Sequence, residues 1–181
     1  ACAGFAVKRI IERFGKDEIY PDDVFILNDP YLAAIHQSDI YTIAPIHHQE
    51  RLIGWSATFV HVNDVGAMSP GGDSPLATEV FQEGLRIPGL KLVERGSLRK
   101  DVFDTITNMT RQPGMVGLDL MCEIAANNVA KCRMQAMYQQ YGSELLDTVA
   151  VEMIRHSESI LRNRISEIPD GIWKEIGTIE A

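Results

Sequence analysis

The chain has 181 residues, of which 45% are hydrophobic and 23% are charged, and its formal net charge is −8. Its length allows one domain with a sizeable core, and these proportions are close to those of soluble globular proteins, which excludes a disordered or fibrous class. The negative net charge and the lack of a run of Lys or Arg argue against nucleic acid or a membrane as the main partner. Because the sequence shows no membrane-spanning segment and no signal peptide, we expect a cytoplasmic protein.

The first predicted elements are a helix and three strands. Apolar residues recur at helical spacing over 5–14, which predicts a short amphipathic helix. The unbroken apolar run 24–27 predicts a strand that is buried on both faces. Two longer segments, 40–46 and 52–62, predict strands joined by the polar residues 47–51, so we expect these two strands to form a hairpin.

A loop and weaker signals follow the hairpin. Residues 65–72 contain three glycines and a proline, which predicts a loop whose backbone can approach a ligand closely. Residues 76–82 are compatible with either a helix or a strand, and 90–93 predict another short strand. We therefore expect a strand-rich region, which carries the site, over residues 1–96.

Residues 97–168 form a region that we predict to be helical. Ser97 is placed to cap a helix that runs to about Thr110. A long helix follows over 115–141, and Ser143 is placed to cap another. The apolar stripe that marks the long helix consists of Leu118, Cys122, Ala125, Val129, Cys132 and Ala136.

The link between the last two helices, at 142–143, is short and favours an antiparallel helical hairpin. A turn at 169–171 then leads into a strand from Ile172, so we predict that 169–181 is the start of a further strand. The predicted fold class is α+β, with an N-terminal mixed or antiparallel sheet followed by the C-terminal helical hairpin. Because the chain opens without Met and ends in an apparent strand, we expect a fragment of a larger subunit.

Two histidines and an aspartate lie at the ends of predicted strands. His36 and Asp39 are three residues apart just before the strand 40–46, and His61 lies near the end of the strand 52–62. If the strands pair as a hairpin, His61 faces back toward the other two residues. Imidazole and carboxylate ligands suit Mn²⁺, Fe²⁺ or Zn²⁺, and two histidines with one carboxylate leave coordination positions open. The alternative is that these are ordinary hydrogen-bonded residues at strand ends.

Two further aspartates are candidate catalytic residues. Asp29 follows the strand 24–27, and Asp64 follows His61 by three residues. Each is a candidate for a fourth ligand, for a group that orients an imidazole, or for a general base. Each is equally suited to form a turn with its own backbone. The chain has no P-loop pattern and no G-x-S-x-G elbow, so we predict neither a nucleotide site nor a serine nucleophile.

Several motifs, in one order, resemble the hydantoinase B/oxoprolinase family. This family includes the B-type subunits of ATP-dependent hydantoinases, 5-oxoprolinase modules, and the metal-carrying large subunits of acetone and acetophenone carboxylases. Its members are several hundred residues long, so the chain resembles an internal portion of them. The motifs that carry the resemblance are VFILNDPY at 24–31, HQSD at 36–39, HVNDVG at 61–66, MSPG at 68–71 and FQEGLRIP at 81–88.

The resemblance implies that His36, Asp39 and His61 are metal ligands, in a ketone-carboxylase pattern whose ion is Mn²⁺; Zn²⁺ and Fe²⁺ are the alternatives. The chain departs from the hydantoinase-like form at two places. Residues 33–34 are Ala-Ala in place of a glycine pair, and Val62 replaces a second histidine. These departures favour the carboxylase form.

The resemblance also implies partners and substrates. In the family, ATP is used at a partner A-type subunit with a kinase-like fold, and the B-type subunit handles the activated intermediate. We therefore expect an A-type partner, with small subunits as further candidates, and a ketone as the small-molecule substrate. Two alternatives stay open: ATP-dependent opening of a cyclic amide such as a hydantoin or 5-oxoproline, and a non-catalytic scaffold within such a complex.

Overall fold

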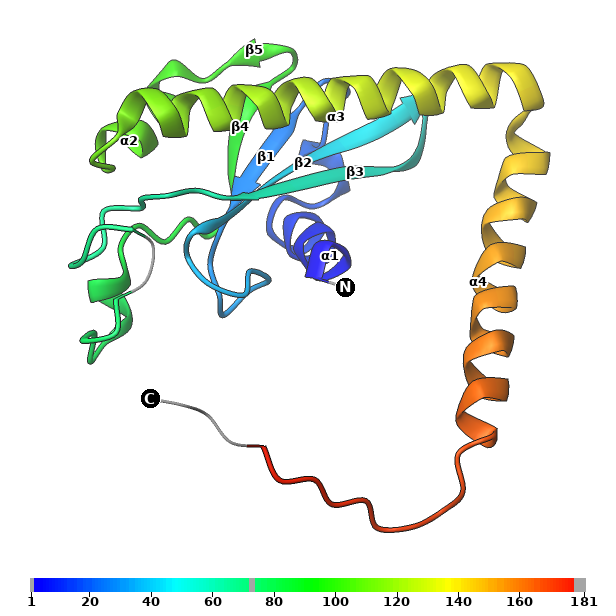
Figure 1. Cartoon of the computed structure of the whole chain (residues 1–181). Helices are drawn as coiled ribbons and strands as arrows, with labels where there is room; N and C mark the ends of the chain where they lie inside the picture. Colours follow the sequence, from blue (N-terminus) through cyan, green and yellow to red (C-terminus); the bar gives the residue numbers. More distant parts are fainter. Residues whose placement is uncertain (1, 72–73, 178–181) are drawn as a thin grey trace. The chain divides into compact units, whose positions relative to one another are not determined.

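The computed structural model describes residues 2–71 and 74–177 (Figure 1). It divides into two compact units, Ala1–Met137 and Tyr138–Ala181, which are described separately. The first unit holds a five-stranded sheet in the order β3-β2-β1-β4-β5, in which all neighbouring strands are antiparallel. The strands are β1 (Val24–Leu27), β2 (Asp39–His48), β3 (Arg51–His61), β4 (Leu90–Glu94) and β5 (Ser97–Leu98). The predicted α+β class with an antiparallel sheet is confirmed.

Helices cover both faces of this sheet (Figure 1). Successive residues of β1 point to opposite faces, so Phe25 packs with Ile10 on one side and Ile26 packs with Leu120 on the other. All four residues of β1 are buried, as predicted for the run 24–27. The helices are α1 (Cys2–Phe14), α2 (Lys100–Asn108), α3 (Pro113–Tyr141) and α4 (Ser143–Ser166), with short 3-10 helices η1 (Lys16–Glu18) and η2 (Val80–Glu83).

The hairpin of β2 and β3 is longer than predicted. Its turn consists of Gln49 and Glu50 alone, and Gln49 takes a φ of 56°. His47 and His48 therefore belong to β2, not to the connection 47–51, because the pairing extends to the residue before the turn. The register of this hairpin decides which residues face each other at its open end, where the candidate site lies.

The predicted Ser97 cap is wrong. Arg95 and Gly96 both have positive φ values and form a tight turn, so Ser97 pairs with Glu94 as part of β5. Helix α2 begins afterwards, at Lys100. A small polar residue after a glycine is compatible with both a helix cap and a hairpin turn, and here the pairing with β4 prevails.

The segment between β3 and β4 crosses the end of the sheet as loops. The undecided stretch 76–82 contains the start of η2, a single 3-10 turn. Gly84, which follows η2, has a φ of 98°, and a Cβ atom there would lie 2.4 Å from the Val65 carbonyl oxygen. Two loop segments therefore touch where only glycine fits. The last residue of the predicted loop 65–72 lies outside the described residues.

Helix α3 buries a face different from the stripe that marks it in the sequence. Leu118 of that stripe is 64% exposed and Val129 is also exposed, whereas Glu123 and Asn127 are buried against the sheet. Asn127 explains part of this choice, because its side chain donates to Thr42 Oγ1 at 2.8 Å and accepts from Ser56 Oγ at 2.6 Å. Both faces of α3 carry apolar residues, so periodicity alone did not select the buried one.

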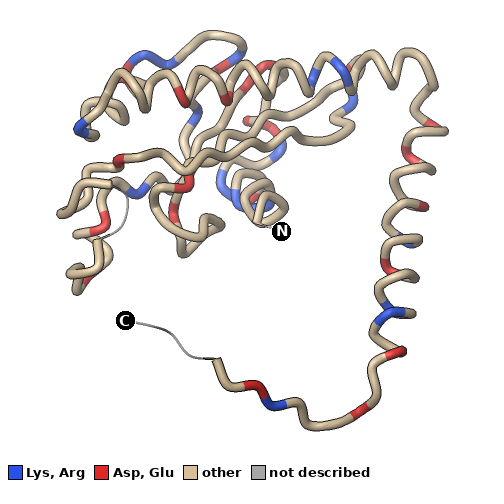
Figure 2. The backbone as a smooth tube through the Cα atoms, viewed as in Figure 1, with Lys and Arg blue, Asp and Glu red and all other residues tan. Residues whose placement is uncertain are grey.

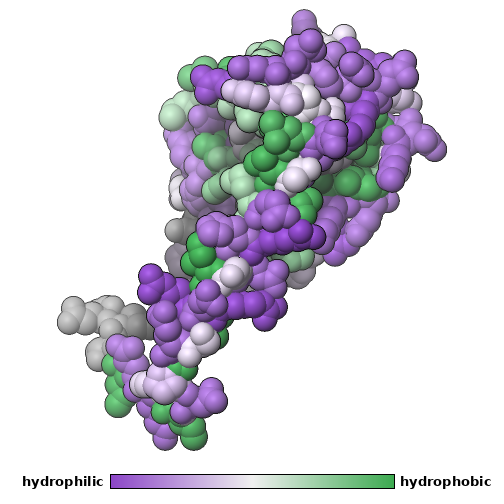
Figure 3. Space-filling model, turned by 90° about the vertical axis from the view of Figure 1, so that its right-hand side faces the viewer, coloured by the Kyte–Doolittle hydropathy of each residue, from purple (hydrophilic) through white to green (hydrophobic). Residues whose placement is uncertain are grey.

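In the second unit, Gly142, with a φ of 80°, precedes α4, and Ser143 is the first helical residue and not the cap. The charged residues in the first half of α4 are acidic, and basic residues join them in the second half (Figure 2), where Arg155 bonds Glu152. Hydrophobic side chains such as Met153 are exposed, and Figure 3 shows them interspersed with hydrophilic ones. The helical hairpin stays a prediction, because α4 and most of α3 belong to different units.

The strand predicted from Ile172 is not formed over 172–177, where no described residue pairs with the segment; 178–181 lie outside the description. A strand requires a partner strand for its backbone hydrogen bonds. No helix in the described part of the chain is long and apolar enough to cross a membrane.

Candidate metal centre

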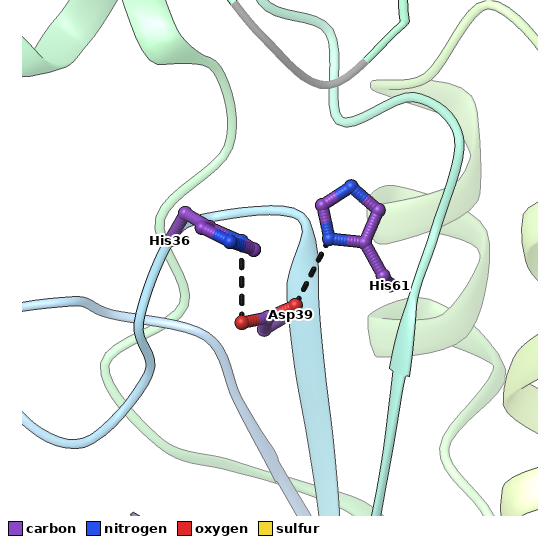
Figure 4. A group of neighbouring side chains, drawn as sticks. All are labelled: His36, Asp39 and His61. Carbon is purple, nitrogen blue, oxygen red and sulfur yellow. Dashed lines mark hydrogen bonds and ion pairs between the residues drawn. The ribbon is translucent and has the colours of Figure 1, made fainter. Parts of the chain in front are cut away.

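The open end of the β2–β3 hairpin brings His36, Asp39 and His61 together (Figure 4). Asp39 is the first residue of β2 and lies opposite His61, the last residue of β3. His36 approaches from the preceding loop, where a turn is closed by the Asp39 N–H donating to the His36 carbonyl at 3.1 Å. The sequence prediction that these three residues converge is therefore what the structure shows.

Asp39 lies between the two imidazoles and contacts each with a different oxygen. Its Oδ1 is 3.0 Å from His61 Nδ1, and its Oδ2 is 3.2 Å from His36 Nδ1. Asp39 is only 3% exposed, whereas both histidines are exposed. The imidazole rings stand edge to face with 4.8 Å between their centroids. The arrangement thus combines a buried carboxylate with two imidazoles that are open to solvent.

The two histidine–aspartate distances are compatible with a transition-metal site. Metal–nitrogen and metal–oxygen bonds of about 2.1 Å at right angles place neighbouring ligand atoms about 3.0 Å apart. The two histidine–aspartate contacts have this length, and one potential ligand atom from each residue lies within 4.8 Å of the others. The donor set of two nitrogens and one carboxylate suits Mn²⁺, Fe²⁺ or Zn²⁺. The same distances also correspond to imidazole–carboxylate hydrogen bonds in the ion-free protein.

The structure places Asp29 in a turn that follows β1. Its Oδ1 accepts from the Tyr31 N–H at 2.9 Å, and its Oδ2 lies 3.4 Å from Arg86 Nε. The Arg86 guanidinium in turn lies near the Tyr31 and Phe81 rings. Both carboxylate oxygens of Asp29 thus have partners outside the three candidate ligands. The bond to the Tyr31 N–H forms the backbone turn that was the alternative to a catalytic role. These contacts favour a role for Asp29 in orienting its loop over a role in proton transfer.

Asp64 joins the loop after β3 to the loop before α3. It is buried, and it accepts from the Arg111 N–H and guanidinium, both at 2.6 Å, and from the Gly66 N–H at 3.2 Å. Burial acts to raise the pKa of Asp64, but these hydrogen bonds and the Arg111 charge outweigh it and hold the pKa below its ordinary value. An ionised, fully bonded carboxylate favours a role in holding the loop over one in proton transfer.

A family comparison matches residues 2–181 with Hydantoinase B/oxoprolinase. The chain belongs to this family. It is 28% identical to the acetophenone carboxylase delta subunit of Aromatoleum aromaticum, over 93% of the chain and 25% of that subunit.

Two solved structures are similar to this hydantoinase B/oxoprolinase chain. The crystal structure of an ATP-dependent caprolactamase from Pseudomonas jessenii has a TM-score of 0.88 at 29% identity, over 94% of this chain and 29% of that one. A nucleotide-free structure of an acetone carboxylase, from a study of ATP-dependent acetone carboxylation, has a TM-score of 0.75 at 28% identity. The match covers 80% of this chain and 19% of the acetone carboxylase chain. The chain thus spans less than a third of the relatives it matches.

Two residues that hold loops next to the candidate ligands in sequence, Asn28 and Arg111, were not among the predicted site residues. Asn28 is fully buried and bonds main-chain groups on two other segments, and Arg111 holds Asp64 from 47 residues away. The sequence feature that could have identified Asn28 is its position at the end of a buried strand, because a buried polar side chain needs hydrogen-bond partners. Arg111 carried no such signal, because an arginine between two predicted helices is ordinarily solvated.

Proposed function

We propose that this chain carries the metal centre of an ATP-dependent ketone carboxylase of the acetone and acetophenone carboxylase type, with Mn²⁺ held by His36, Asp39 and His61. The observation that carries the proposal is the convergence of these three side chains around the buried Asp39 carboxylate. When bound, a divalent ion there stabilises negative charge that develops on a substrate oxygen. Asp39 supplies the compensating charge and orients both imidazoles, and their exposed sides leave room for substrate.

Val62 supports the carboxylase form over the hydantoinase form. Its side chain is fully buried in the core beside Ile40 and Val65, so His61 alone projects from this strand end toward the site. The hydantoinase-like form of the family, as the motif comparison implies, has a second histidine here. The similarity to an acetophenone carboxylase subunit and to an acetone carboxylase structure supports a carboxylase as a candidate, although the chain is as similar to cyclic-amide hydrolases of the family.

The second candidate is ATP-dependent opening of a cyclic amide. It is favoured by the fold match to caprolactamase, which covers nearly the whole chain with a TM-score of 0.88. The same three ligands would serve both reactions, because each needs stabilisation of charge on an oxygen. The substrates therefore separate the two candidates, and the ligand set does not.

The proposal includes a partner. ATP would be used at an A-type subunit, with which this chain would assemble in the cytoplasm, and small subunits are further candidates. The delta-subunit relative supports an assembly of several chains. Within this chain, Asp29 and Asp64 would act by orienting the loops that carry the ligands, since their oxygens bond Arg86, Arg111 and backbone N–H groups.

Metal analysis of the intact protein, purified with its ATP-using partner, tests the metal centre. We expect Mn²⁺ in the wild type and its loss in His36→Ala and His61→Ala. His156→Ala, which removes an exposed histidine of α4, is the matched control and should keep the metal. Full metal content and activity in His61→Ala would contradict the ligand assignment.

Substrate dependence of ATP hydrolysis separates the two reactions. We expect ATP use that requires both bicarbonate and a ketone such as acetone or acetophenone. ATP use stimulated by caprolactam, a hydantoin or 5-oxoproline, and independent of bicarbonate, would instead establish the second candidate.

A further inference from the structure

Asn28 joins three segments of the chain through one buried side chain. It follows β1 and is 0% exposed. Its Nδ2 donates to the Gln37 carbonyl at 2.6 Å and to the Leu85 carbonyl at 2.9 Å, and its Oδ1 accepts from the Ile87 N–H at 2.6 Å. Both N–H groups and the oxygen of this amide are therefore used, and all three partners are main-chain groups.

The first of these bonds acts on the loop that carries His36. Gln37 is the next residue, so the Asn28 amide fixes the peptide group between Gln37 and Ser38, one residue beyond the histidine. The Gln37 side chain is itself buried, and its Nε2 donates to the Val80 carbonyl at 3.2 Å. The turn that brings His36 to Asp39 is thus tied to Asn28 and to the segment 80–87.

The same segment also holds the loop that follows His61. The Leu85 N–H donates to the Val65 carbonyl at 2.8 Å, and the Met68 N–H donates to the Gln82 carbonyl at 2.7 Å. The close approach of Gly84 to Val65 lies between these two bonds. Residues 80–87 therefore bond both the loop that leads to one candidate ligand and the loop that leaves the other.

We propose that Asn28 and residues 80–87, together called the ligand brace, set the spacing of His36 and His61 and so the affinity of the metal centre. These are positioning residues, which act through the histidines and not on a substrate. The inference rests on the proposed metal centre and adds to it the device that fixes the geometry. Ligand sets lose their function when their support lets them move by about 1 Å.

A matched pair of variants separates positioning from simple stability. Asn28→Leu replaces the amide by an apolar group of similar size and leaves three main-chain groups without their partner. Asn127→Leu makes the same replacement at an equally buried asparagine. Its partners are the hydroxyl groups of Thr42, Ser56 and Thr58 and the Thr42 carbonyl, within β2 and β3 and not in the ligand loops. Both variants lower the melting temperature, because each leaves buried polar groups unpaired.

The measurement that distinguishes the two variants is the binding of Mn²⁺ alone to the intact protein. Titration gives the affinity, and the electron paramagnetic resonance spectrum of the bound ion reports the geometry of its ligands. We expect Asn28→Leu to lower the affinity by about 10- to 100-fold, as loss of groups that orient metal ligands typically does, and to alter the spectrum. Asn127→Leu should keep the wild-type affinity and spectrum. Equal effects of the two variants, or none, would overturn the positioning role.

Gln37→Met keeps the test decisive if Asn28→Leu does not fold. This change preserves the shape and the backbone carbonyl of residue 37 but removes the bond to Val80. It also removes Oε1, which has no partner in the part of the chain that the structure describes, so the folding cost is small. We expect a loss of Mn²⁺ affinity smaller than that of Asn28→Leu. Unchanged affinity in this folded variant would overturn the proposal.

Histidine NMR of the metal-free protein distinguishes failure of the brace from failure of the metal centre. At one fixed pH, we expect the imidazole signals of His36 to shift in Asn28→Leu and to stay in place in Asn127→Leu. If the wild type binds no metal but these signals shift, the metal centre is wrong and the positioning role stands. If the wild type binds Mn²⁺ and neither signals nor affinity change, the brace alone is wrong.

Discussion

Asp39 and His61 face each other across the open end of the β2–β3 hairpin, with 3.0 Å between Asp39 Oδ1 and His61 Nδ1. The other oxygen of Asp39 contacts His36, so one buried carboxylate holds both imidazoles.

Asp39→Asn should lower Mn²⁺ affinity by more than about 100-fold, a larger loss than is typical of groups that only orient ligands. The substitution keeps the shape of the side chain but removes the negative charge and turns one ligand atom into a donor. Isothermal titration with Mn²⁺ measures the effect. Asp104→Asn, at an exposed position of α2, is the control and should bind as the wild type does. Wild-type affinity in Asp39→Asn would remove Asp39 from the ligand set.

Gly84→Ala should destabilise the protein by about 1–3 kcal/mol or more, because the residue has a positive φ and its Cβ would overlap the Val65 carbonyl. Gly54→Ala is the matched control, since a Cβ there meets no atom within 4 Å. Chemical denaturation of both variants gives the comparison. Similar midpoints for the two would contradict the close contact between these loops.

Arg111→Ala should destabilise the protein by about 1–3 kcal/mol at pH 7, because it leaves the buried Asp64 carboxylate without its charged partner. The pKa of Asp64 is depressed in the folded protein, so the unfolded state binds more protons in acid. The stability that this carboxylate contributes is present above its unfolded pKa of about 4 and is lost as the pH falls below that value.

Denaturation curves of wild type and Arg111→Ala between pH 3 and pH 7 test this sign, at values chosen around the unfolded pKa of about 4. The difference in stability between the two proteins should shrink toward acid. A difference that is constant or grows toward acid would show that Asp64 is not the group through which Arg111 acts.

Glu123→Gln should make the protein more stable at alkaline pH. Glu123 is 6% exposed, and burial, followed by the charge of Asp119, raises its pKa to about 8, against an opposing effect of Thr42. Between its ordinary value of 4.5 and about 8, the folded state binds more protons than the unfolded state. Stability therefore falls as the pH rises through this window, by up to about 1.4 kcal/mol per unit.

The glutamine side chain of the variant does not titrate. The stability of the variant should therefore equal that of the wild type near the low end of that pH window and exceed it at the high end. Thermal melts across the window measure the difference. Glu50→Gln, which changes an exposed carboxylate in the β2–β3 turn, should follow the wild type throughout. A parallel pH dependence in Glu123→Gln would assign the effect to another group.

The convergence of the three candidate ligands and the order of the central strands were predictable for related reasons. His36, Asp39 and His61 lie at strand ends, and a hairpin register leaves few ways to arrange them. The buried run 24–27 predicted the central strand because its residues are apolar on both faces. The family motifs then raised the three residues above other histidines such as His156.

Other features lay beyond the sequence because their partners are main-chain groups. Asn28 bonds the carbonyl of Leu85 and the N–H of Ile87, 57 and 59 residues away, and no side chain signals those contacts. The buried face of α3 was equally hidden, because Leu118 and Leu120 mark opposite faces of one helix. The packing of Leu120 with Ile26 and the buried polar contacts of Asn127 show which face meets the sheet.

The register of β2 and β3 has a consequence for folding. Sliding one strand by a single residue would present Val60 or Val62 to Asp39 in place of His61 and would turn every side chain of that strand to the other face. An ion that needs both histidines and the carboxylate can bind only the correctly paired hairpin. Such an ion would stabilise the native register of β2 and β3 relative to the slipped registers. Removing it with a chelator would then lower the stability of the protein and increase the population of hairpins with a slipped register.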